Sequence, residues 1–356
     1  FFCISLMEDT GYMARAAFIM DKLMHKIGLH GKSFIPLIMG FGCNVPAIMA
    51  TRTLENRKDR VLTMLIIPFM SCSARLPVYV LLISAFFPDN QGIVLLSIYT
   101  VGIIIAILMA ILFKKIFFSK KDIPFVMELP PYRVPTIRNT ATHMWDKSVQ
   151  YLKKMGTVIL VASVIIWALG HFPTSVRYSK DYDALASTIT ANVTLPDSVR
   201  QKQLVRIENE KQSEHLEKSY IGKIGKFIEP AIAPLGFDWK IGVSIVTGLA
   251  AKEIVVGSMG VMYQSGNSID ASSVSLKNKL KDQVYQSGPR AGRKVFTPLV
   301  AFTLMLFVLI YFPCAATLSA MKKEAGTAWA LFAVFYTTAV AWVVSFAVFQ
   351  IGSMFT

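Results

Sequence analysis

Long apolar segments separated by shorter polar ones dominate the chain. A hydrocarbon core of roughly 30 Å needs about 20 apolar residues in a helix that crosses it. Five segments reach or approach this length and predict membrane spans, at 60–87, 92–113, 155–171, 298–321 and 327–353. The third is the shortest, and aromatic residues typical of membrane interfaces flank it. The pattern predicts an all-α polytopic membrane protein.

The apolar segment 33–50 has basic residues on both sides, which predicts that both of its ends face the cytoplasm. It is only about 18 residues long and contains two prolines and two glycines, a composition that favours a re-entrant hairpin over a full span. The tip of this hairpin is expected at GFGCNVP, residues 40–46.

A second segment, 241–259, aligns with 33–51 without gaps and pairs Gly40 with Gly248 and Cys43 with Ala251. Each hairpin is followed by a long helix that a cysteine interrupts, IIPFMSCSARLPVY and VLIYFPCAATLSAM, and then by one further span. Such pairs of broken helices are typical of transporters with inverted repeats. We therefore expect a first membrane repeat at 1–121, a cytoplasmic amphipathic connector at 122–154, and a second membrane repeat at 155–356 with a polar external insert at 172–220.

Two features of the sequence disagree about the side of the membrane on which 264–296 lies. Six Lys and Arg residues in this segment favour the cytoplasm if 239–262 is a full span. Inverted repeats instead place both the second hairpin and this segment outside.

Composition agrees with the membrane interpretation. Hydrophobic residues make up 54% of the 356 residues, charged residues 17%, and mean hydropathy is +0.50, which excludes an ordinary soluble domain. The formal net charge of +15 could indicate nucleic acid binding. The basic residues lie beside apolar segments, however, where membrane lipid is the expected partner, so we predict no nucleic acid.

Two helix breaks carry cysteines. Pro68 and Pro77 flank Cys72, and Pro313 precedes Cys314. Unwound backbone at membrane depth is tolerated where it is buried in protein or lines a wet cavity, so paired breaks predict a site near the midplane. With Cys43 at the hairpin tip, these thiols predict a transition-metal ion as cargo. The alternative for each cysteine is a small buried apolar residue. For Cys3, in an unbroken apolar run, this alternative is favoured and no functional role is assigned.

Charged and polar residues in apolar segments supply further candidates. Glu253 is predicted to be a ligand or a proton carrier, with an ion pair to Lys252 or Arg75 as the alternative. Accessory groups are Glu8, Asp9, Lys252, Asn44, Ser71 and Ser73. Glu8 and Asp9 could equally lie at the membrane interface, and the small polar residues could serve helix packing.

Nothing in the sequence predicts catalysis. GLHGKS at 28–33 has Lys26 where a P-loop needs glycine, and the H-E-x-x-H pattern of metal hydrolases does not occur. We predict that this chain is a transporter and not an enzyme.

Residues 8–60, which include GFGCNVPAIMATRTLENRKDR, together with IPFMSCSARLP, GLAAKEIVVG and the pair Pro313 and Cys314, resemble the FeoB family of bacterial ferrous iron transporters. The resemblance implies Fe(II) uptake across the bacterial inner membrane by a multi-pass permease. Cys43, Cys72, Cys314 and Glu253 match the residues that the family is proposed to use along the iron path. The long polar insert before the second broken helix departs from the family pattern.

The same resemblance implies that GTP and Mg act only through an N-terminal G domain, which we expect to be absent because the chain opens inside an apolar run. A homo-oligomer and small cytoplasmic accessory proteins are expected partners. The alternative function is a nucleoside or other small-solute carrier of similar Gate architecture, whose site should offer amide and aromatic groups instead of thiols.

Overall fold

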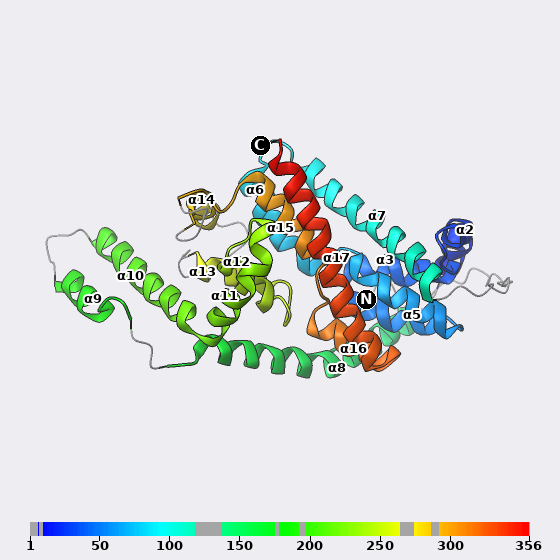
Figure 1. Cartoon of the computed structure of the whole chain (residues 1–356). Helices are drawn as coiled ribbons and strands as arrows, with labels where there is room; N and C mark the ends of the chain where they lie inside the picture. The colour runs from blue at the N-terminus through cyan, green and yellow to red at the C-terminus, as the bar shows by residue number, and fades with distance from the viewer. Residues whose placement is uncertain are drawn as a thin grey trace. The chain divides into compact units, whose positions relative to one another are not determined.

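A computed structural model describes residues 6, 10–117, 137–174, 178–191, 197–263, 274–285 and 292–355 (Figure 1). In these ranges the structure is almost entirely helical, and its β pairing is limited to a bridge between Val284 and Lys294. The all-α prediction is confirmed. The chain forms two compact units, which we describe separately. The first comprises Phe1–Ser73, Ser97–Val161 and Leu309–Ala339, and the second comprises Ala74–Leu96, Ala162–Val308 and Val340–Thr356.

The first unit contains the first hairpin and the helices around it. Its elements are α2 (Tyr12–Lys26), α3 (Phe34–Gly42), α4 (Asn44–Ala50), α5 (Arg57–Ile66), most of α7 (Gln91–Phe117), the first part of α8 (Ile137–His171), α16 (Ala315–Ala325) and the first part of α17 (Thr327–Ser353). Asn56 begins α5 by accepting a hydrogen bond from Lys58 N at 3.0 Å. From residue 61 onward α5 is buried.

Aromatic rings pack against the end of α5. Phe113 of α7 and Tyr336 of α17 meet edge to face at 5.0 Å between ring centroids, and Phe69 lies 5.9 Å from Tyr336. The Tyr336 hydroxyl donates a hydrogen bond to the carbonyl of Leu65. Because α5 ends at Ile66, this carbonyl belongs to its last turn and needs a donor from outside the helix. The break after α5 is therefore supported by a neighbouring helix.

The second unit contains the second hairpin and the polar insert. Its elements are α6 (Leu76–Phe86), α9 (Tyr182–Ala191), α10 (Asp197–Lys218), α11 (Tyr220–Ile232), α12 (Trp239–Thr247), α13 (Ile254–Met262), α14 (Val274–Asp282), most of α15 (Pro298–Ile310) and the remaining parts of α7, α8 and α17. Asp238 begins α12 by accepting hydrogen bonds from Ile241 N at 2.8 Å and Tyr263 Oη at 3.0 Å.

Helices α11 and α12 pack side by side at two glycines (Figure 1). A methyl group at Gly225 of α11 would lie 2.5 Å from Cγ2 of Val243, and one at Gly242 of α12 would lie 3.0 Å from Cδ1 of Ile232. Small residues at a helix crossing let two backbones approach closely. The crossing therefore depends on the absence of a side chain at Gly225, whereas at Gly242 the close atom is the end of the flexible Ile232 side chain.

The polar insert forms two helices that an acidic residue joins. Glu214 of α10 accepts hydrogen bonds from Ser179 N at 2.7 Å, Tyr182 Oη at 2.7 Å and Lys218 Nζ at 2.7 Å. Burial raises the pKa of Glu214, but these hydrogen bonds outweigh burial and lower the pKa to about 2. Glu214 therefore stays ionised near neutral pH and holds the segment before α9 against α10.

Four of the predicted spans are confirmed as helical segments long and apolar enough to cross a membrane, at Arg57–Phe86, Gln91–Ile116, Pro298–Ala325 and Thr327–Ser353. The fifth, 155–171, is the end of α8, whose apolar stretch Leu160–His171 is shorter. Residues 122–136 of the predicted connector lie outside the described ranges. From Ile137 onward α8 continues through residue 154, so the expected boundary between connector and span does not coincide with a helix end.

Candidate metal site

The tip of the first hairpin is a helix break of one residue. Helix α3 ends at Gly42, α4 begins at Asn44, and Cys43 between them is extended with φ −152° and ψ 132°. The Cys43 side chain is half-buried. The helix break falls on the cysteine, within the tip predicted at residues 40–46.

Asn44 is the buried polar group of this tip. The residue is 4% exposed, and its Oδ1 has no hydrogen-bond partner in the described part of the chain. An unsatisfied buried polar atom costs about 1–3 kcal/mol, so such atoms are rare unless a ligand completes them. Asn44 follows Cys43 in the sequence, and amide oxygen and thiolate are both donors that a divalent transition-metal ion accepts.

The first broken helix passes directly against this tip. Helix α5 ends at Ile66, a 3₁₀ turn covers Ile67–Phe69, residues 70–72 are irregular, and α6 begins at Leu76. Ser73 Oγ donates a hydrogen bond to the Gly42 carbonyl at 2.9 Å. A methyl group at Gly40 would lie 3.0 Å from Cβ of Met70. The segment that carries the buried Cys72 therefore lies beside the segment that carries Cys43.

The second broken helix brings Cys314 to the same unit. Helix α15 ends at Ile310 and α16 begins after Cys314, whose Sγ lies 3.2 Å from Thr317 Oγ1. Helix α16 packs against α4 of the hairpin. At the far end of α16, Glu324 accepts hydrogen bonds from Arg52 Nε at 2.9 and 2.8 Å. Both predicted helix breaks are confirmed, and the first unit contains all three of these cysteines.

Of the other predicted site residues, Ser71 and Ser73 flank Cys72, and the rest lie elsewhere. Glu253 belongs to the second unit, where it is exposed at the break between α12 and α13 and forms no ion pair with another described residue. Its neighbour Lys252 is 2% exposed. Ser71 is buried and Ser73 exposed. Glu8 and Asp9, together with Cys3, lie outside the described ranges.

No group of three His, Cys, Asp or Glu side chains lies close enough together to hold a metal ion within the described ranges. Asn44 is not one of these residue types, although its amide oxygen is a buried acceptor without a hydrogen-bond partner among the described residues. The sequence also did not indicate the Tyr336 support of α5, because helical periodicity does not tell which helices are neighbours.

The second hairpin has the same helix, break and helix order as the first but a longer break. Helix α12 ends at Thr247 and α13 begins at Ile254, so six residues, 248–253, separate them. The Thr247 and Ser258 hydroxyls lie 2.8 Å apart and join the two arms. The alignment of Cys43 with Ala251 therefore places each residue within a helix break.

Two family models match the chain. One, described as Gate with nucleoside recognition, matches residues 1–86 and 152–328, and the other, described as the ferrous iron transport protein B C terminus, matches residues 95–147. No solved structure matches the chain.

Similar proteins match along almost the whole chain. An Fe(2+) transport protein A/Fe(2+) transporter FeoB fusion protein of Porphyromonas gingivalis is 52% identical, covering 100% of this chain and 42% of that protein. Fe(2+) transporter FeoB of Campylobacter jejuni is 43% identical, with 97% and 50% covered. The Helicobacter pylori protein of the same name is 40% identical, with 98% and 53% covered. The chain thus spans about half the length of these relatives, and it belongs to the FeoB family of Fe(2+) transporters.

Proposed function

We propose that the chain is the permease part of a ferrous iron transporter and that Fe(II) is its cargo. The observation that carries the proposal is the contact between the Cys43 and Cys72 segments beside the unpartnered amide oxygen of Asn44. The relatives are named as Fe(2+) transporters, so the alternative of a nucleoside carrier is not favoured.

The proposed donors, thiolates and an amide oxygen, suit an ion that is bound and released during transport better than an ion that stays bound. Fe(II) is of borderline softness and accepts both thiolate and amide oxygen donors. Conduction needs binding that is strong enough for entry and weak enough for release. We propose that Cys43, Cys72 and Asn44 form one station on the path, that Cys314 provides another thiol, and that Glu253 serves a separate step in the second unit.

The other parts of the transport system are assigned outside this chain. We propose that GTP and Mg act through sequence that the relatives have beyond the match, and that this chain has no hydrolytic activity. The fusion to Fe(2+) transport protein A in the Porphyromonas gingivalis relative supports a small accessory protein as partner. A homo-oligomer in the bacterial inner membrane completes the proposal.

Contacts within the second unit support an external position for α14 and Phe296. Helix α14 packs against α6, and Phe296 stacks on Phe86 at 6.1 Å between ring centroids. Phe86 ends α6 just before the turn into α7, and the opposite end of α7 carries Lys114 and Lys115. Basic residues favour the cytoplasm, so the end of α7 with Lys114 and Lys115 faces inward. The turn between α6 and α7 therefore faces outward. We therefore propose that 264–296 is external, as inverted repeats require.

Labelling of introduced cysteines tests this orientation. Asn278 is exposed on α14 and Lys58 is exposed at the start of α5. In intact spheroplasts that produce the full-length protein, a membrane-impermeant maleimide is expected to label Asn278→Cys fully. Lys58→Cys is expected to react only after lysis. Labelling of Asn278→Cys that also requires lysis would contradict the external position.

Direct transport tests the function. Purified full-length protein in proteoliposomes is expected to accumulate radioactive Fe(II) under reducing conditions well above protein-free vesicles. Excess uridine or adenosine should leave this uptake unchanged. Nucleoside accumulation without Fe(II) uptake would instead support the carrier alternative.

A further inference from the structure

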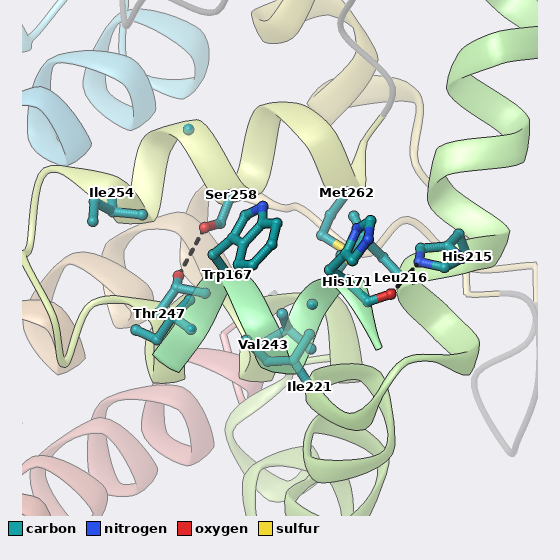
Figure 2. A pocket seen from close by; sticks show the side chains of 13 residues that line it. Trp167, His171, His215, Leu216, Ile221, Val243, Thr247, Ile254, Ser258 and Met262 are labelled. Atoms are coloured by element: carbon teal, nitrogen blue, oxygen red, sulfur yellow. Dashed lines mark hydrogen bonds between the residues drawn. The ribbon is translucent and has the colours of Figure 1, made fainter. Parts of the chain in front are cut away.

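A cavity of about 450 Å³ lies against the second hairpin (Figure 2). Its walls come from α8, α10, α11, α12 and α13, all from residues of the second unit. Side chains of both hairpin arms line it, Val243 and Thr247 from α12 and Ser258 and Met262 from α13. The volume falls in the range of roughly 300–1,000 Å³ that is typical of ligand pockets. An occupant would therefore contact both arms of the hairpin at once.

The Thr247, Ser258 and His215 side chains that line this cavity are hydrogen-bonded within the protein. The hydroxyls of Thr247 and Ser258 pair at 2.8 Å, and Thr247 also donates to the Ser244 carbonyl at 2.8 Å. At the other end of the cavity, His215 Nε2 lies 3.1 Å from the His171 carbonyl, and His215 Nδ1 lies 3.4 Å from Tyr178 Oη. A polar ligand such as a nucleoside would have to break these bonds. The lining favours an apolar occupant.

The cavity is continuous with a surface of α8 that the described residues leave exposed. Trp167 lines the cavity and is 62% exposed. Val164 and Ile165, on the same stretch of α8, are more than half exposed as well. In a protein with several helices able to span a bilayer, acyl chains are the medium that covers such a surface. The Trp167 and His171 rings stack with 5.1 Å between their centroids. This arrangement of aromatic and polar groups suits the membrane interface.

We propose that this cavity binds an acyl chain of a membrane phospholipid, with the headgroup at the end formed by His171 and His215. The acyl chain enters from the bilayer past Trp167 and lies between α8 and the two arms of the second hairpin. The acyl chain contacts both arms, α12 and α13, at once. The proposal rests on the membrane position of the chain, which the proposed function shares, but not on iron as cargo.

Gly257 allows a direct test, because a methyl group there would meet no atom within 4 Å. Because Gly257 also lines the cavity, a cysteine side chain at this position begins in open space at the cavity wall. We expect a small maleimide to label Gly257→Cys of the full-length protein in detergent, as read by peptide mass spectrometry. Palmitoyl-oleoyl phosphatidylcholine in mixed micelles should slow this labelling at least threefold, and glycerophosphocholine, which lacks acyl chains, should not. A labelling rate that phospholipid leaves unchanged would overturn the proposal.

A second readout uses the occupied protein. Native mass spectrometry is expected to find phospholipid bound to the wild type and to Gly92→Leu, and none to Gly257→Leu. Gly92, in α7, is a matched control because a methyl group there also meets nothing within 4 Å and it does not line the cavity. Equal lipid retention in both variants would contradict the site, as would protection by a free fatty acid but not by phospholipid. These measurements contain no iron, so they stay informative if iron transport fails.

Discussion

Replacement of Cys72 by serine is expected to reduce Fe(II) uptake by at least about tenfold, the scale on which metal sites lose affinity when their coordination is disturbed. Cys72 is buried in the irregular segment that Ser73 ties to the Gly42 carbonyl at 2.9 Å, next to Cys43. A serine hydroxyl is close in size to the thiol but is a much harder donor, so packing is retained while affinity for a borderline metal falls. Radioactive Fe(II) uptake into proteoliposomes, measured with the full-length variant, provides the test.

The matched control is Cys3→Ser, since the sequence places Cys3 in an apolar run without a helix breaker. This variant should transport iron like the wild type. Asn44→Leu provides an independent test, because it replaces the side-chain amide, whose oxygen has no hydrogen-bond partner among the described residues, with an apolar group. It should be at least as stable to heat as the wild type while uptake falls. Normal uptake in both Cys72→Ser and Asn44→Leu would remove the thiol and amide site from the iron path.

The breaks could be predicted from the sequence because their causes are local. Proline removes a backbone donor and clashes with the preceding turn, so Pro68 and Pro313 were sufficient to place interruptions at Cys72 and Cys314. The break at Cys43 followed from the glycines and prolines around it. In each case the structure ends a helix within a few residues of the predicted position.

Packing between distant segments could not be predicted in the same way. Periodicity did not reveal that Tyr336 would bond to the Leu65 carbonyl, or that Asn44 would be buried without a partner. The connector boundary at residue 154 was expected from a change in composition, yet α8 continues through it because helical hydrogen bonds do not depend on whether a side chain is polar. The cavity beside Trp167 needs five helices, so no single segment of sequence carries its signal.

Gly225→Ala is expected to destabilise the second unit by about 1–3 kcal/mol, the usual cost of overpacking. The added methyl group would lie 2.5 Å from Cγ2 of Val243 and 3.0 Å from the Trp239 carbonyl oxygen. Backbone at Trp239 cannot rotate away, so α11 and α12 have to separate. Alanine otherwise favours a helix over glycine by about 1 kcal/mol, so without the clash the same change would stabilise the protein. The sign of the change in thermal midpoint, followed by tryptophan fluorescence in detergent, therefore reports the crossing directly.

Gly257→Ala is the matched control because Gly257 is also inside a helix of the second unit and has open space around it. This variant should keep or slightly raise the midpoint, while Gly225→Ala lowers it. Combining Gly225→Ala with Val243→Ala removes the closest contact, so the double variant should lose less stability than the sum of the two single variants. Additive losses, or a midpoint that rises in Gly225→Ala, would show that α11 and α12 do not cross at this glycine. Because α12 is the first arm of the second hairpin, a loosened crossing is also expected to increase labelling of Gly257→Cys.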